Sequence, residues 1–259
     1  MSSPRRPVSL LRALVVGLVL VLLAGCSSDS DTPRPPGDPV SDAESQVLAQ
    51  VLARNVEEGG ADFVVTAPYA DGAVLTLTGE VDFTQPAGRA QAVTTFDDGR
   101  PDDTRTLFFT DESIWFGDVP GLAEAVAQAN LPEVSYVRRP LGGEATAGNA
   151  SLVDVLLTMV LRLASDQEQD PRSFSGYTWQ SSELIDGELA SRFSNGQGTT
   201  VAVAADSELL VQYIGRITDQ EFDVTITLSD HGPVEITLPS DEETLSATEY
   251  PEIAAALGV

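Results

Sequence analysis

The stretch at residues 74–83, Val-Leu-Thr-Leu-Thr-Gly-Glu-Val-Asp-Phe, decides the fold of this chain. From Leu75 to Phe83 every second residue is apolar or glycine, and the residues between them are polar. This period of two predicts a strand with one buried and one solvated face, which is typical of an antiparallel sheet. Residues 222–229, Phe-Asp-Val-Thr-Ile-Thr-Leu-Ser, repeat the pattern. Both halves of the chain are therefore expected to contribute strands.

Similar but weaker patterns predict the rest of the sheet, about ten strands in all. The turn at 231–233 is expected to join residues 222–229 to a last strand at 234–238, and Asn195-Gly196 predicts a two-residue hairpin. From Ser240 on, the chain reads as a loosely attached tail. The other predicted strands are 62–69, 89–97, 105–110, 113–116, 177–181, 189–193, 199–204 and 208–217.

Three segments have helical spacing. The first follows Ser41, whose spacing to Glu44 is that of a capping box, and the second covers 120–129. The third, 152–163, is apolar at nine of twelve positions. Because helices and strands do not alternate regularly, we expect an α+β fold for 41–259: one domain with a large antiparallel sheet that carries helices on a face.

The N-terminus has the pattern of an export signal. Three arginines among the first twelve residues precede an apolar run at 13–25, which is shorter than the roughly 20 residues that a membrane-spanning helix needs. Leu23-Ala24-Gly25-Cys26 resembles the lipobox of bacterial lipoproteins, which implies that the sulfur of Cys26 receives diacylglycerol, that palmitate-type acyl chains follow, and that 1–25 is removed. The alternatives are an uncleaved anchor helix or an ordinary secretory signal. Residues 26–40, rich in Pro, Asp and Ser, are predicted to be a disordered tether.

The composition limits the partners. The formal net charge is −26, all 14 basic residues are arginine, and there is one cysteine and one histidine. Such a charge disfavours nucleic acid, which repels an acidic surface, and one cysteine cannot form an internal disulfide. We expect a monomer on the extracytoplasmic face of the cell membrane, held there through acylated Cys26.

No enzyme or cofactor is predicted. His231 lies in the predicted turn, close to Ser229 and Asp230, and neighbours in a turn cannot form a catalytic triad, so a hydrolase is the least favoured reading. The four carboxylates in 97–103 suggest either a calcium site or an exposed hairpin loop, although their spacing is not that of an EF-hand. Metal sites built from His or Cys are excluded for lack of ligands.

The order of the elements resembles a known family. A lipobox and tether precede a helix, a meander beginning at Leu75-Thr76-Leu77-Thr78-Gly79, a helical insertion, the turn at 184–189 and the late hairpin 224–239. This resembles the actinobacterial LppX/LprG lipoproteins of the wider LolA/LolB-like group. The resemblance implies a strongly curved half-barrel sheet with helices on its concave face, and a space between them that holds acylated lipids. It also implies lipid transport or envelope lipid assembly without chemistry.

The helix at 152–163 is the centre of the functional hypothesis. Its polar residues Asp154, Thr158 and Arg162 form one narrow stripe, so the helix must be covered on several sides, either by a lipid cavity or by a solid core. The leading hypothesis is an envelope lipoprotein that binds a lipid or glycolipid; the alternative is an acidic interaction module with a filled core. The candidate cavity residues are Val153, Leu156, Met159, Val160, Leu163, Trp115, Phe116, Leu122 and Val126.

Overall fold

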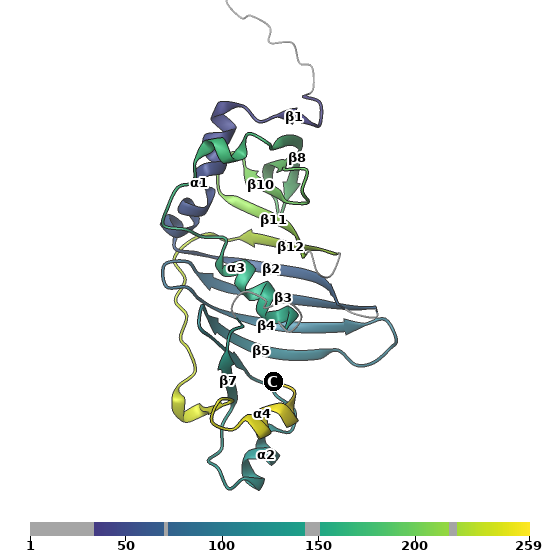
Figure 1. Cartoon of the computed structure of the whole chain (residues 1–259), viewed down its shortest axis with the longest axis vertical. Coiled ribbons are helices and arrows are strands. Elements are labelled where there is room, and N and C mark those ends of the chain that lie inside the picture. Colours follow the sequence, from purple (N-terminus) through teal and green to yellow (C-terminus); the bar gives the residue numbers. More distant parts are fainter. Residues whose placement is uncertain (1–33, 70–71, 143–150, 218–221) are drawn as a thin grey trace, which may run out of the picture. The chain divides into compact units, whose positions relative to one another are not determined.

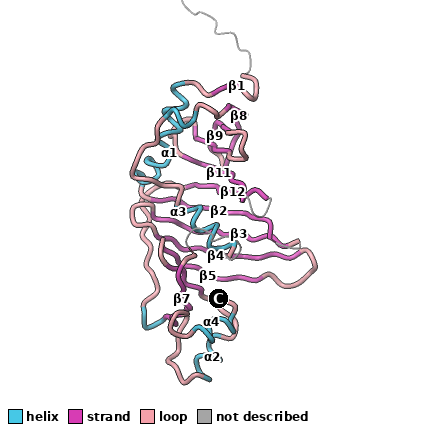
Figure 2. Tube along the Cα trace, viewed as in Figure 1, coloured by secondary structure: helices cyan, strands magenta, loops and turns pink. Residues whose placement is uncertain are grey.

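A computed structural model describes residues 34–69, 72–142, 151–217 and 222–259. The predicted fold class is confirmed: a thirteen-stranded sheet carries α-helices in an α+β fold (Figures 1 and 2). The strand order is β1-β8-β9-β10-β11-β12-β2-β3-β4-β5-β6-β7-β13, and every neighbouring pair is antiparallel except β7–β13. The predicted signal, Cys26 and the first part of the predicted tether lie outside the described residues.

Two meanders make up most of the sheet and meet where β12 pairs with β2. Hydrogen bonding between consecutive strands accounts for the order within each meander. The first meander consists of β2 (Gly60–Tyr69), β3 (Ala73–Asp82), β4 (Ala87–Phe96), β5 (Asp103–Thr110), β6 (Ser113–Phe116) and β7 (Tyr136–Pro140). The second consists of β8 (Thr178–Ile185), β9 (Glu188–Ser194), β10 (Thr200–Ala204), β11 (Leu210–Ile217) and β12 (Phe222–Ser229).

The three predicted helices form, and a fourth joins them. α1 (Asp42–Glu58) begins at the predicted capping box, in which the Ser41 hydroxyl accepts from the Glu44 N–H and the Glu44 carboxylate accepts from the Ser41 N–H. The two other predicted helices are α2 (Leu122–Gln128) and α3 (Leu152–Leu161), and α4 (Pro251–Leu257) is the addition. The described residues also contain two 3₁₀ turns, η1 (Pro171–Phe174) and η2 (Asp241–Glu243).

One face of the sheet carries the main core. Along β2 the residues alternate between buried and exposed, so Phe63 and Val65 point to the core while Val64 and Thr66 face solvent. α1 and α3 cover the buried face, and α3 lies across the strands of the first meander (Figure 1). The middle of α3 is completely buried there, because Leu156, Leu157 and Val160 are 0% exposed.

The prediction that the chain from Ser240 on is a loosely attached tail is wrong. β13 (Thr244–Ser246) pairs in parallel with β7, and α4 packs beside α2, so the C-terminal residues build a second core. Leu245 is only 4% exposed. The sequence signal was weak because these elements are short and alternate poorly, and only β7 and α2 provide the surface that they bury.

The predicted strand at 234–238 is also wrong. These residues form no strand, although they alternate well, and therefore 222–229 and 234–238 do not form the late hairpin. The edge of β12 that a returning strand would use is already paired with β2. After β12 the Gly232 N–H donates to the Gly60 carbonyl at 3.0 Å, and the chain then runs on toward η2.

Three smaller expectations also differ. Ser194 pairs with Thr200, so β9 and β10 are joined by a five-residue loop at 195–199 rather than a two-residue hairpin. Asp82, expected on the solvated face, is 7% exposed because its carboxylate accepts from the Thr84 and Gln85 N–H groups. The predicted tether extends to residue 40, whereas β1 (Asp38–Pro39) already pairs with β8.

Candidate functional site

Two cavities lie on the covered face of the sheet, one at each end of α3. The first is bounded by α1, the C-terminal end of α3 and the second meander, and we call it the α1–α3 cavity. The second lies between the N-terminal end of α3 and strands β3 to β6, and we call it the α3–β5 cavity. The fully buried middle of α3 lies between the two ends that line them.

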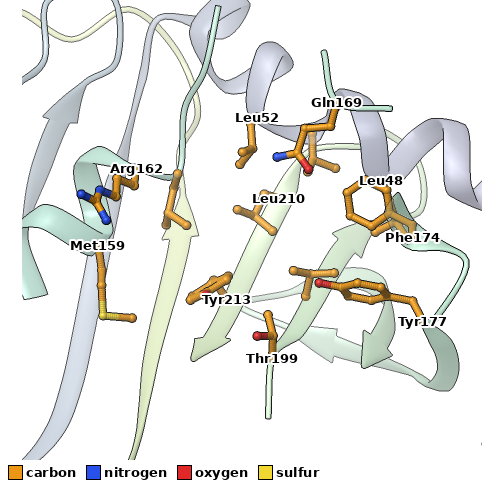
Figure 3. A pocket seen from close by; sticks show the side chains of 13 residues that line it. Leu48, Leu52, Met159, Arg162, Gln169, Phe174, Tyr177, Thr199, Leu210 and Tyr213 are labelled. Carbon is orange, nitrogen blue, oxygen red and sulfur yellow. The ribbon is translucent and has the colours of Figure 1, made fainter. Parts of the chain in front are cut away.

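The α1–α3 cavity has a volume of about 350 Å³ and mostly apolar walls. Figure 3 shows Met159 and Arg162 on one side, Phe174 and Tyr177 on the other, and Leu210 between them. α1 and the buried positions of β10 and β11 supply the remaining apolar surface. The lining is Leu48, Val51, Leu52, Met159, Arg162, Leu163, Gln169, Phe174, Tyr177, Thr199, Val201, Leu210 and Tyr213.

Polar groups are few in the α1–α3 cavity. Burial raises the pKa of the Tyr177 hydroxyl, the neighbouring Tyr213 raises it further, and a side-chain hydrogen bond with Asn195 acts in the opposite direction. Tyr177 therefore stays a neutral phenol at physiological pH. The other polar side chains of the lining are Arg162, Gln169, Thr199 and Tyr213. A small number of polar groups on an apolar wall is typical of a site that orients an apolar ligand.

The α3–β5 cavity is larger, about 810 Å³, and more polar. Charged side chains from β5, β7 and α3 stand beside apolar ones from the sheet and from Leu257 of α4. The apolar members are Leu75, Ala92, Phe96, Leu107, Phe116, Leu152, Val153, Leu257 and Val259, and the polar side chains are Thr94, Asp103, Arg105, Arg139, Ser151 and Asp154.

A buried ion pair fixes the N-terminal end of α3. Both Asp154 oxygens accept from the Arg139 guanidinium, Nη1 to Oδ2 at 2.8 Å and Nη2 to Oδ1 at 2.7 Å, and the Gly142 N–H donates to Oδ2 at 2.9 Å. The Asp154 side chain is 4% exposed. The guanidinium also lies 5.0 Å from the centre of the Phe116 ring. This arrangement ties α3 to β7.

The nine candidate residues fall into three groups. Met159 and Leu163 line the α1–α3 cavity, and Val153 and Phe116 line the α3–β5 cavity. Leu156 and Val160 are in the solid core that separates the two. The other three do not face α3: Leu122 and Val126 belong to the second core, and Trp115 pairs with Phe108 on the opposite face of the sheet. These three residues line neither of the two cavities.

Most of the α1–α3 cavity was missed from the sequence. Leu48, Val51 and Leu52 fall in the helix predicted to follow Ser41, and Val201 and Leu210 fall in predicted strands, but none of them was a candidate cavity residue. Periodicity shows that such residues point inward, which identifies the buried face. It does not show which inward positions are left without a packing partner, because that depends on where α1, α3 and η1 dock.

The His231 side chain is hydrogen-bonded to the main chain. Its Nε2 lies 3.1 Å from the Leu210 carbonyl oxygen. Burial lowers the pKa of His231 below its usual 6.5, while this hydrogen bond and nearby carboxylates such as Glu188 oppose the shift. The imidazole is therefore neutral at physiological pH, and its Nε2 is used in the contact with the Leu210 carbonyl.

Of the acidic segment 97–103, residues 97–102 form an exposed hairpin connection between β4 and β5, as one of the two readings held, and Asp103 is the first residue of β5. Asp98 accepts from Arg100 Nε at 2.8 Å, which lowers the pKa of Asp98, and Asp103 pairs with Arg105. Within the described residues, no cluster of three or more His, Cys, Asp or Glu side chains is placed to hold a metal ion.

The chain is similar to proteins of known structure. The crystal structure of LprF from Mycobacterium bovis is similar at 16% sequence identity, over 79% of this chain and 99% of that chain, with a TM-score of 0.44. No family model and no curated protein sequence matches the chain. In the described part of the chain, no helix has both the length and the apolarity needed to cross a bilayer.

Proposed function

We propose that this protein is an envelope lipoprotein, anchored through acylated Cys26, that holds a lipid acyl chain in the α1–α3 cavity. The observation that carries the proposal is the cavity itself: apolar side chains from α1, α3, β10 and β11 surround a space of about 350 Å³. Cavities of about 300–1,000 Å³ are typical of small-ligand sites. At the lower end of that range, the cavity suits one acyl chain better than a whole multi-chain lipid.

Binding would be driven by removal of the acyl chain from water. Each buried CH₂ group contributes about 0.8 kcal/mol, so eight such groups offer roughly 6 kcal/mol before the costs of association. The Tyr177 hydroxyl, whose pKa is raised by burial, is suited to an ester or hydroxyl group of the lipid because it stays uncharged at physiological pH. The protein would act by carrying or presenting lipid, without chemistry.

Filling the cavity should abolish lipid binding. Met159 lines the cavity and is only partly buried, so Met159→Trp places an indole in the space with little effect on the core. We expect at least a tenfold weaker affinity for dodecanol, a neutral single-chain probe, in isothermal titration calorimetry. Mass spectrometry of the Met159→Trp variant, extracted gently from its membrane, should also detect no bound acyl lipid.

Val153→Trp is the matched control, since it makes a similar change on the same helix but in the α3–β5 cavity. This variant should keep the wild-type affinity for dodecanol. If Met159→Trp binds dodecanol as well as the wild type does, or if wild-type protein carries no lipid, the carrier function is wrong and an interaction module with a filled core is favoured.

The anchor is tested separately. Cys26 is the only cysteine in the chain, so Cys26→Ala removes the sole thiol that could receive diacylglycerol. We expect the variant to move from the membrane to the soluble fraction or to keep residues 1–25, as measured by fractionation and intact mass. Ser28→Ala should be processed normally. Unchanged membrane retention of Cys26→Ala would contradict lipidation.

A further inference from the structure

The α3–β5 cavity has a charged end that the packing of the sheet does not require. Arg105 of β5 is in register with Ala92, Leu77 and Val65 of the neighbouring strands, all on the covered face. These three partners are buried, at 6%, 0% and 0% exposure. The Arg105 guanidinium therefore lies at the end of a row of apolar side chains that crosses the strands. It is on the covered face of the sheet, where apolar side chains alone would form the core.

Only part of this guanidinium is used by the protein. Its Nη1 donates to the Thr104 and Asp118 carbonyls, each at 3.2 Å, and lies 2.6 Å from Oδ1 of Asp103. Among the described residues, all polar contacts of Arg105 are made by Nη1. The two carbonyls hold the side chain in place, and the edge formed by Nη2 and Nε is left for a ligand.

The ion pair between Arg105 and Asp103 can be replaced by a pair between Arg105 and an anionic ligand at little cost. The Asp103 side chain is 47% exposed, and ion pairs at that exposure contribute little to stability. Arg139, on the other side of the cavity, differs because both of its terminal nitrogens are bonded to buried Asp154. Of the two arginines, Arg105 is thus the one available to an incoming anion.

We propose that the α3–β5 cavity binds the anionic end of an amphiphile, a carboxylate or a phosphate, through Arg105. The Nη2–Nε edge matches the two oxygens of such a group in a bidentate pair. The apolar chain then lies over Leu75, Leu107 and Phe116, which line the same cavity. This site is separate from the α1–α3 cavity, and its ligand differs by carrying a negative charge.

The test uses three twelve-carbon probes that differ only in the head group: dodecanoate, dodecyl phosphate and dodecanol. Titration calorimetry at about 0.15 M salt is performed on the Met159→Trp variant, in which the α1–α3 cavity is filled, with circular dichroism to confirm folding. We expect at least one anionic probe to bind at least tenfold more tightly than dodecanol. The stronger of the two anions identifies carboxylate or phosphate as the preferred head group.

Asp103→Asn gives a result that a purely structural role would not produce. Removal of the competing carboxylate should increase the affinity for the anionic probe severalfold and leave dodecanol unchanged. Asp102→Asn is the matched control, because it removes the same charge from the adjacent, exposed residue, and it should have a much smaller effect. In Arg105→Gln the preference for the anion should disappear.

Val153→Trp, added to the same background, should abolish binding of the anionic probe by filling the cavity. The proposal is overturned if dodecanol binds as tightly as both anions, or if Asp103→Asn has no larger effect than Asp102→Asn. Neither outcome bears on the α1–α3 cavity, whose own test is the loss of neutral lipid in Met159→Trp.

Discussion

Asp154→Ala is expected to destabilise the protein by about 3–5 kcal/mol, the cost of removing one partner of a buried ion pair. The Arg139 side chain is 19% exposed and would lose both carboxylate oxygens as acceptors, which leaves it the Pro140 carbonyl at 3.1 Å, and the Gly142 N–H would lose its acceptor as well. Because α3 is tied to β7 through this carboxylate, the loss should appear as a lower midpoint in urea and a melting temperature lower by about 10 °C.

The exposed pair between Arg138 and Asp241 provides the control. Its N–O distance is 3.1 Å, but the Asp241 side chain is 88% exposed, so Asp241→Ala should cost less than about 1 kcal/mol. A double variant, Asp154→Leu with Arg139→Met, should recover much of the lost stability, because apolar side chains of similar volume leave no unpaired charge. Equal effects of Asp154→Ala and Asp241→Ala would contradict the structural role of the buried pair.

Removal of residues 244–259 is expected to cost at least about 4 kcal/mol, since the loss of one buried leucine alone costs about 2–5 kcal/mol. The deletion takes away β13 and α4 and uncovers the apolar side chains that they bury. It also exposes the edge of β7, which becomes free to pair with another chain. We expect a lower urea midpoint together with concentration-dependent aggregation in light scattering. The uncovered side chains are Val119, Leu122, Val126 and Val137.

Two point variants refine this prediction. Leu245→Ala should reproduce about 2–4 kcal/mol of the loss while it keeps β13 in place, so aggregation should not increase. Leu184→Ala, at a position 73% exposed, should change the stability by less than about 0.5 kcal/mol. A truncated protein as stable as the full chain would mean that residues 244–259 are a loose tail after all.

Local patterns were sufficient for most individual elements. β6 and β12 have the bounds predicted from alternation, and α1 begins at the predicted capping box. Such signals depend on neighbours in sequence, so they are visible in the sequence itself. The strand predicted at 234–238 shows where such patterns fail. It alternates as well as a strand does, but β2 already occupies the edge of β12 that it would need.

Only some of the residues that line the candidate site could be predicted from the sequence. Of the candidate residues after Val153 in this segment, Met159 and Leu163 line the α1–α3 cavity, whereas Leu156 and Val160 are packed solidly. All four are apolar and have helical spacing, so residue type does not separate them. The difference arises because the sheet contacts the middle of α3 closely, while space remains at its two ends.

The sequence by itself determined the alternating strands, the start of α1, the acidic charge and the lipobox-like end, because each depends on residue type and local spacing. Tertiary structure alone decided three other features. It joined the two meanders through β12 and β2, recruited the C-terminal residues as β13 and α4, and left a cavity at each end of α3. All three depend on which surfaces meet when distant segments pack. The sequence pattern shows which face of an element is buried, but it does not show which other element covers that face.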